Sequence, residues 1–263
     1  MTTVKDFDSF FASRIPYGMK EDFDNVGLLV GMNSGEVKKA LIALDITCET
    51  VQEAADFGAQ LIISHHPLFF GLQKITDEEP TGKAIISLIS SGISAICLHT
   101  NLDSAAGGVN DALMQRIGAV NLGILGQAHE SPLGAYGIGR FGELPQAETI
   151  RGFLLRLKNV LGTNGLRYHD AGRPVSRIAV CGGSGGEYLE KAVQLGCDTY
   201  LTADIKYDRF ITAKELGINL IDGDHFCTEN VVVPVLERLV RENFPEVETR
   251  ISSRHQQTAK FFV

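Results

Sequence analysis

A strand–helix–strand pattern occurs twice in this sequence, first in residues 37–66 and again, at a constant offset of 138 residues, in residues 175–204. In each copy an apolar run typical of a buried strand precedes an amphipathic helical pattern, and a glycine, Gly58 or Gly196, ends the helix before a second apolar run. Two generic units of this kind can resemble one another by chance. An offset that stays constant from the first run to the last favours an internal duplication instead.

The order of these patterns predicts an α/β fold with mostly parallel sheets and right-handed crossovers. A further helical pattern at residues 82–91 leads to an apolar run at residues 93–98, and a shorter helix in the second copy leads to a corresponding run at residues 217–221. We therefore expect two similar α/β lobes. The first lobe would contain residues 1–126 and 230–263, and the second would contain residues 127–229.

Side chains that bind metal ions cluster directly after three of the apolar runs. The clusters are Ser64-His65-His66-Pro67, His99-Thr100-Asn101-Leu102-Asp103 and His225-Phe226-Cys227-Thr228-Glu229. The carboxyl ends of parallel strands meet at one edge of a sheet, where ligands usually bind. Three imidazoles and two carboxylates exceed the needs of a closed single-zinc site and suit a dinuclear centre with open positions. Its ligands would be His65, His66, Asp103, His225 and Glu229, in a cleft between the lobes.

The spacing within each cluster limits how its side chains can bind. Consecutive side chains of an extended segment point to opposite sides, so His65 and His66 would flank two ions, or bind one if the backbone turns sharply before Pro67. His225 and Glu229 are four residues apart and share a face if their segment begins a helix. A single histidine at a strand end is more often a hydrogen-bonded structural residue, but three independent clusters together favour a metal site.

Two further features bear on catalysis. His99 and Asp204 are candidates for proton transfer, although His99 could instead orient a ligand, contact the substrate or cap its strand. The run Gly182-Gly183-Ser184-Gly185 follows a strand-like segment, and its backbone N–H groups could bind an anionic part of a substrate. The alternative is a tight turn between a strand and a helix, because the lysine and serine of a nucleotide-binding loop are missing from this run.

Composition argues against several classes of function. The formal net charge is −8 and no basic run exceeds two residues, so a general nucleic-acid-binding role is not expected. No stretch approaches the roughly 20 consecutive apolar residues that span a membrane, and the amino-terminal segment has no apolar core of a signal peptide. The 5 cysteines are dispersed, which indicates reduced thiols. We therefore expect a cytoplasmic protein that does not bind membranes.

Six motifs, in order along nearly the whole chain, resemble the NIF-three-like proteins, which are named GTP cyclohydrolase 1 type 2 homologues. The motifs are Asp24-Asn-Val-Gly-Leu-Leu-Val-Gly31, Ser64-His-His-Pro67, His99-Thr-Asn-Leu-Asp103, Gly182-Gly-Ser-Gly185, Thr202-Ala-Asp-Ile-Lys206 and Asp224-His-Phe-Cys-Thr-Glu229. The departures from the family pattern are small. Phe23 stands where tryptophan is common, and Ala203 stands where glycine is common.

The resemblance implies two α/β lobes around a dinuclear metal site, and a homo-oligomer in the form of a toroidal hexamer. It assigns the metal ligands to His65, His66, Asp103, His225 and Glu229, with the glutamate bridging both ions. Imidazole and carboxylate ligands suit two divalent Zn, Fe or Mn ions. The expected activity is hydrolysis of a small nucleotide-like or other anionic substrate by metal-activated water. The alternative is a non-enzymatic ring that binds metal or a partner protein, as a chaperone or scaffold.

Overall fold

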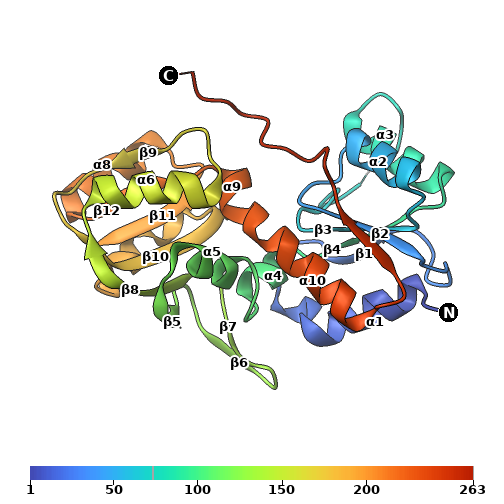
Figure 1. The fold of residues 1–263 in the computed structure, drawn as a ribbon, viewed down its shortest axis with the longest axis horizontal. Helices are drawn as coiled ribbons and strands as arrows, with labels where there is room; N and C mark the ends of the chain where they lie inside the picture. The colour runs from blue at the N-terminus through green and yellow to red at the C-terminus, as the bar shows by residue number, and fades with distance from the viewer. Residues whose placement is uncertain (73, 263) are drawn as a thin grey trace. The chain divides into compact units, whose positions relative to one another are not determined.

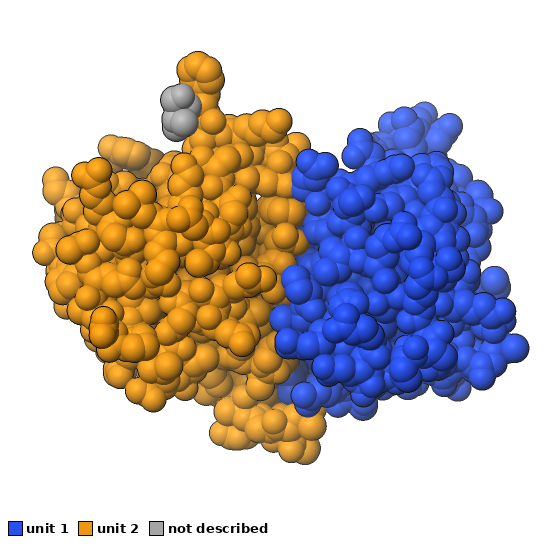
Figure 2. All heavy atoms as spheres, in the orientation of Figure 1, with its two compact units in different colours: residues 1–102, 233–256 blue, residues 103–232, 257–263 orange. Residues whose placement is uncertain are grey.

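The computed structural model describes residues 1–72 and 74–262 and has a mixed α/β fold (Figure 1). Residues 1–102 and 233–256 form one compact unit, and residues 103–232 and 257–263 form the other (Figure 2). Each unit has a sheet and a hydrophobic core of its own. Among the described residues, no helix has both the length and the apolar character needed to cross a membrane. The cysteines are free thiols, and all except Cys48 are buried.

The first unit contains a five-stranded sheet with the order β1-β4-β3-β2-β13. Its strands are β1 (Gly27–Val30), β2 (Lys39–Ala43), β3 (Leu61–Ser64), β4 (Ser94–Cys97) and β13 (Glu248–Ile251). Strands β13, β2, β3 and β4 pair in parallel, and β1 pairs antiparallel with β4 at the edge. The helices of this unit are α1 (Val4–Arg14), η1 (Tyr17–Met19), α2 (Cys48–Phe57), α3 (Pro80–Ser90) and α10 (Val233–Asn243), and α4 (Thr100–Ser104) runs from this unit into the second.

Local signals in the sequence determine where helix α2 begins and ends. The Thr47 hydroxyl accepts a hydrogen bond from the Thr50 amide at 3.2 Å, which satisfies one of the free N–H groups of the first turn. Gly58 ends the helix in a left-handed conformation with φ 72°. The helix buries Val51 and Ala54 in the core of the unit, and this burial stabilises α2 against the sheet.

The second unit contains a six-stranded sheet with the order β5-β8-β10-β11-β12-β9 and a separate β6–β7 hairpin. The strands are β5 (Val120–Ile124), β6 (His129–Ser131), β7 (Gly134–Tyr136), β8 (Arg140–Glu148), β9 (Arg167–His169), β10 (Val175–Ser184), β11 (Thr199–Ala203) and β12 (Asn219–Asp222). The helices are α5 (Val109–Ile117), α6 (Ile150–Leu161), η2 (Gly186–Tyr188), α7 (Leu189–Gln194), α8 (Tyr207–Leu216), α9 (His225–Glu229) and η3 (Asn230–Val232).

The two similar sequence segments pair their strands in the same register. Ala40 on β2 pairs with Leu61 on β3, and the positions 138 residues later, Ile178 on β10 and Thr199 on β11, pair in the same parallel manner. The next strand continues the match at the shorter offset of 125 residues, since Leu61 pairs with Ser94 and Thr199 pairs with Asn219. Equal offsets therefore correspond to equal places in the two sheets.

The outer strands of the second sheet differ from the predicted parallel arrangement. Parallel pairing joins β10, β11 and β12, whereas β8 pairs antiparallel with both β10 and β5, and β9 pairs antiparallel with β12. The sequence pattern did not predict β5 and β9, because these strands are short and largely exposed and carry no buried apolar run. In both sheets the central parallel strands end at one edge, and the predicted site residues follow those ends.

Candidate metal centre

Three histidines come together in the first unit. His65 and His66 directly follow β3, and His99 follows the neighbouring strand β4. One ring nitrogen of each histidine lies within 4.8 Å of a ring nitrogen of the other two, a spacing that allows shared metal binding. His65 and His66 are predicted ligands and His99 is a predicted proton carrier, and the structure places His99 in the same group as the two predicted ligands.

The three imidazoles are all held through Nδ1. His65 Nδ1 donates to the Leu98 carbonyl oxygen at 2.8 Å, His66 Nδ1 donates to Asp45 Oδ1 at 2.6 Å, and His99 Nδ1 donates to Asp24 Oδ1 at 2.8 Å. A proton on Nδ1 leaves the lone pair of the neutral ring on Nε2. Metal-binding histidines are commonly fixed in this way, which orients the ring and increases its basicity.

Asp24 is a buried carboxylate that supports His99. Besides the imidazole, it accepts hydrogen bonds from the Thr100 amide, at 2.9 Å, and from the Thr100 hydroxyl. Burial alone would raise the pKa of Asp24, but the hydrogen bonds from His99 and Thr100 outweigh it and hold that pKa well below the usual range. The carboxylate is therefore ionised at neutral pH and keeps the Nδ1 proton on His99.

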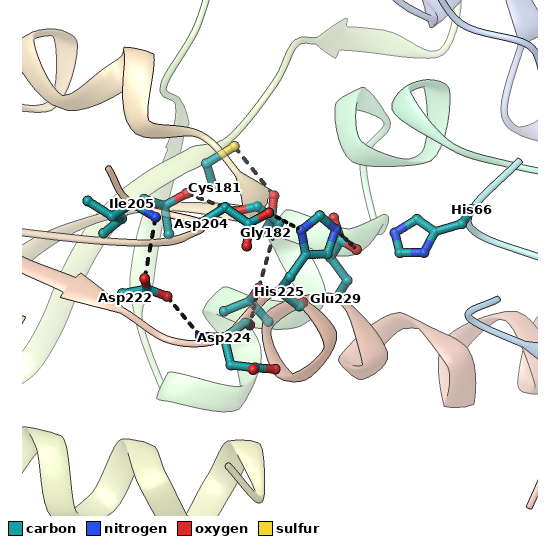
Figure 3. Close-up of polar contacts among 12 residues, drawn as sticks. His66, Cys181, Gly182, Asp204, Ile205, Asp222, Asp224, His225 and Glu229 are labelled. Carbon is teal, nitrogen blue, oxygen red and sulfur yellow. Dashed lines mark hydrogen bonds and ion pairs between the residues drawn. The ribbon is translucent and has the colours of Figure 1, made fainter. Parts of the chain in front are cut away.

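The second unit contributes His225 and Glu229, which lie on one face of α9. His225 Nε2 is 3.0 Å from Glu229 Oε2, and His225 Nδ1 is 2.7 Å from Asp204 Oδ2, so the imidazole lies between two carboxylates (Figure 3). Burial lowers the pKa of His225, but the contacts with Glu229 and Asp204 outweigh it and raise the pKa to about 9. The carboxylates that favour a proton on this ring also favour a metal cation beside it.

Two buried carboxylates lie close together in the same unit. Asp103 on α4 is 8% exposed and Glu229 is 3% exposed, and one oxygen of each lies within 4.8 Å of the other. Burying two like charges at this distance is costly unless a cation accompanies them. Imidazole and carboxylate donors suit Zn, Fe and Mn, so the residues of both units fit the predicted metals.

Gly182 and Gly183, near the end of β10, lie against Glu229. The Gly182 amide donates to Asn110 Oδ1 at 2.9 Å and the Gly183 amide donates to Thr228 Oγ1 at 3.0 Å. Two of the four residues predicted to bind an anion therefore use their N–H groups in hydrogen bonds within the protein. A Cβ at Gly183 would lie 2.0 Å from Glu229 Oε1. Glycine is required here because the glutamate occupies the space of a side chain.

Sequence reasoning missed the carboxylates that support the histidines. Asp45 follows β2 and Asp24 lies in the loop before β1, and neither was assigned a role. Their signal was weak, because single aspartates in the loops beside strands are common in turns and N-caps. Asp204 was predicted as a proton carrier, and the structure places its carboxylate against a predicted ligand, His225.

Comparison with known proteins identifies the family. The model of the family described as Duf34/NIF3 (NGG1p interacting factor 3) matches residues 2–258. The chain belongs to the DUF34/NIF3 family. A DUF34/NIF3 relative from Clostridium perfringens, named "GTP cyclohydrolase 1 type 2 homolog", is 38% identical over 250 residues, which cover 94% of each chain. A relative of the same name from Clostridium acetobutylicum is 37% identical over 237 residues, which cover 89% of this chain and 88% of the relative.

Solved structures share the DUF34/NIF3 fold. Staphylococcus aureus protein SA1388 superposes with a TM-score of 0.91 at 30% identity, over 99% of both chains. A Bacillus cereus protein related to NIF3 superposes with a TM-score of 0.93 at 24% identity, again over 99% of both chains. The second likeness concerns the fold alone.

Proposed function

We propose that this chain is a metal-dependent hydrolase that acts on a nucleotide-like or other anionic substrate. The proposed ligands of its two divalent ions are His65, His66, Asp103, His225 and Glu229. The observation that carries this proposal is the pair of buried carboxylates, Asp103 and Glu229, whose charges favour a bound cation. The relatives named GTP cyclohydrolase 1 type 2 homolog support a hydrolytic reaction.

The supporting side chains would determine how the site works. When bound, a pair of divalent ions lowers the pKa of a water molecule and stabilises negative charge on a reacting oxygen. Asp45 and Asp204 hold the imidazoles of His66 and His225 through Nδ1, so each ring would present Nε2 in one orientation. Asp204 would thus act through His225 and not on the substrate.

His99 is the proposed proton carrier. Its Nδ1 is engaged with Asp24, so Nε2 is the atom that would exchange a proton with the substrate or a water molecule. For the proposed anion contact at Gly182, Gly183, Ser184 and Gly185, the exposed Ser184 is the best placed, because the amides of the first two glycines serve the fold. We also propose a cytoplasmic, toroidal homohexamer, which light scattering would test by giving a mass of about six chains.

Turnover measurements test the proposal directly. The protein would be loaded with Mn, Zn or Fe and incubated with nucleoside triphosphates and other small phosphate compounds. We expect hydrolysis of at least one substrate, and a loss of about 100-fold in Glu229→Gln, which removes a charge while keeping the side-chain shape. Glu215→Gln, at an exposed position on α8, is the matched control and should keep full activity. If no substrate turns over with any of the metals, the chain is a metal-binding or partner-binding scaffold.

A further inference from the structure

Two phenylalanines of the first unit are exposed side by side. Phe23 is 66% exposed and Phe70 is 56% exposed, and their ring centroids are 6.0 Å apart at an interplanar angle of 51°. A pair of exposed aromatic rings leaves apolar surface in water that folding would otherwise remove. Contiguous exposed apolar surface on a protein is a feature of ligand-binding and partner-binding sites.

Hydrogen bonds hold the two loops that carry these rings. Phe23 precedes Asp24, whose carboxylate accepts from His99 Nδ1 and from the Thr100 amide. Asn25 Nδ2 donates to the Phe69 carbonyl oxygen at 3.0 Å, which joins the loop of Phe23 to the loop of Phe70. Each aromatic residue is therefore next to a residue that is held by hydrogen bonds. This limits the movement of the backbone that carries the rings before a ligand binds.

The ring pair leads directly to the histidine group. The Phe70 ring centroid is 5.9 Å from the His99 ring centroid, at an interplanar angle of 60°. His99 in turn lies 5.3 Å from the His65 ring and 5.8 Å from the His66 ring. A flat molecule resting on Phe70 would thus lie beside the imidazoles that we propose as metal ligands and proton carrier.

We propose that Phe23 and Phe70 form an aromatic platform that stacks on a planar heteroaromatic ring of the substrate. The proposal rests on the proposed function and narrows its substrate class from anions in general to ring-bearing nucleotide-like molecules. Aromatic side chains bind the faces of all nucleobases, and such stacking changes affinity by about 5-fold to 100-fold per base. Phe70 also lines a hollow of about 570 Å³, in which Lys74 supplies a cation suited to an attached phosphate and Glu79 supplies an opposing charge.

Fluorescence offers a direct test, because the chain contains no tryptophan. Phe23→Trp places the single tryptophan of the chain on the platform. Guanosine triphosphate and adenosine triphosphate should quench its emission by stacking, whereas inorganic triphosphate, which has the charge without the ring, should not. Tyr207→Trp in the chain that keeps Phe23 is the matched control, since Tyr207 is 80% exposed on α8, in the second unit. Its emission should not respond to any of the three compounds.

A second variant measures the contribution of the ring face to affinity. Phe70→Leu keeps an apolar side chain but removes the planar surface. In equilibrium dialysis we expect nucleoside triphosphate binding to weaken by about 10-fold, while inorganic triphosphate binding and metal content stay unchanged. Equal nucleotide affinity in Phe70→Leu and the unaltered chain would overturn the platform.

Two other outcomes separate the platform from alternatives. If light scattering shows that Phe70→Leu changes the number of chains in the assembly without changing nucleotide affinity, the rings pack against a second copy and the platform is refuted. If nucleotides quench the Phe23→Trp emission and binding weakens in Phe70→Leu, but no metal binds and no nucleotide is hydrolysed, the platform stands and the hydrolase assignment fails.

Discussion

Asp204 has a left-handed backbone conformation, with φ 51°, and its carboxylate contacts a proposed metal ligand. Asp224, the N-cap of α9, has φ 71° and accepts from the Cys227 amide at 3.0 Å. Residues other than glycine rarely adopt this conformation, and it persists where neighbouring contacts require it. At the residue scale, Asp204 therefore holds the imidazole of His225, and Asp224 holds the first turn of the helix that carries it.

Asp204→Asn tests whether this carboxylate supports metal binding. The amide keeps the side-chain shape but lacks the negative charge that orients and polarises His225. We expect metal affinity to fall by about 10-fold to 100-fold in chelator competition, with the fold retained in circular dichroism. Asp208→Asn, at an exposed position four residues later, is the control and should bind metal normally. Unchanged affinity in Asp204→Asn would remove Asp204 from the site.

Gly183→Ala tests the close approach between β10 and Glu229. The added Cβ would lie 2.0 Å from Glu229 Oε1 at a backbone φ of 65°, so the glutamate must move and metal retention should fall. Gly172→Ala is matched to it, because Gly172 has φ 72° with no atom within 4 Å of an added Cβ. Each change should lower the free energy of unfolding by about 1 kcal/mol, because alanine is strained at a positive φ. Equal metal content in the two variants would contradict the role of Gly183.

The sequence predicted the metal-binding side chains more readily than their supports. Histidine pairs and a histidine–glutamate spacing of four are rare enough to be noticed, and their positions after apolar runs placed them at a sheet edge. Asp24 and Asp45 support those rings across 75 and 21 residues of chain, respectively. Contacts over such separations depend on how the strands pair, which a residue pattern does not specify. The metal-ligand assignment itself stays a prediction.

At the scale of structural elements, Glu53 links helix α2 to the segment that follows strand β13. This buried carboxylate accepts hydrogen bonds from the Ser252 hydroxyl, the Ser253 amide and the Arg254 amide, and so fixes the segment that follows β13. Burial raises the pKa of Glu53, but these hydrogen bonds outweigh it and lower the pKa to about 2. The contribution to stability is therefore complete above the unfolded-state pKa of about 4.5 and is lost as the pH falls toward 2.

Glu53→Gln should weaken this link at neutral pH. Because charged hydrogen bonds each contribute about 1.5–3 kcal/mol, we expect local stability at residues 248–254 to fall by about 2 kcal/mol. Hydrogen–deuterium exchange of this segment would measure the change, and the difference from the unaltered chain should shrink as the pH is lowered from 5 toward 2. Glu49→Gln, exposed on the same helix, should leave exchange unchanged. Identical exchange in all three proteins would contradict this role of Glu53.

Elements with a strong apolar pattern were the predictable ones. The helix expected before Gly58 is α2 (Cys48–Phe57), and the one expected at residues 82–91 is α3 (Pro80–Ser90). Strands β5 and β9 were not predicted, because their residues are largely exposed. Exposed strands form through pairing with neighbouring strands and not through burial of their own side chains. The predicted internal duplication stays an interpretation, which the equal strand registers support.

At the scale of the whole molecule, the proposed ligands are distributed over both compact units. His65 and His66 belong to the unit formed by residues 1–102 and 233–256, while Asp103, His225 and Glu229 belong to the other. Each unit has its own core, so removing one imidazole should leave both folds intact while changing metal content. Metal content is therefore the property that tests the proposed ligands of each unit separately from its fold.

Metal content per chain is the most direct test of this account. The protein, His66→Ala and His225→Ala would be loaded with Mn or Zn, desalted and measured by elemental mass spectrometry. His129→Ala, exposed on the β6–β7 hairpin, is the matched control. We predict about two ions per chain in the unaltered protein and the control, and a clear loss in each of the other two variants. Two ions retained in both His66→Ala and His225→Ala would contradict the proposed ligand assignment.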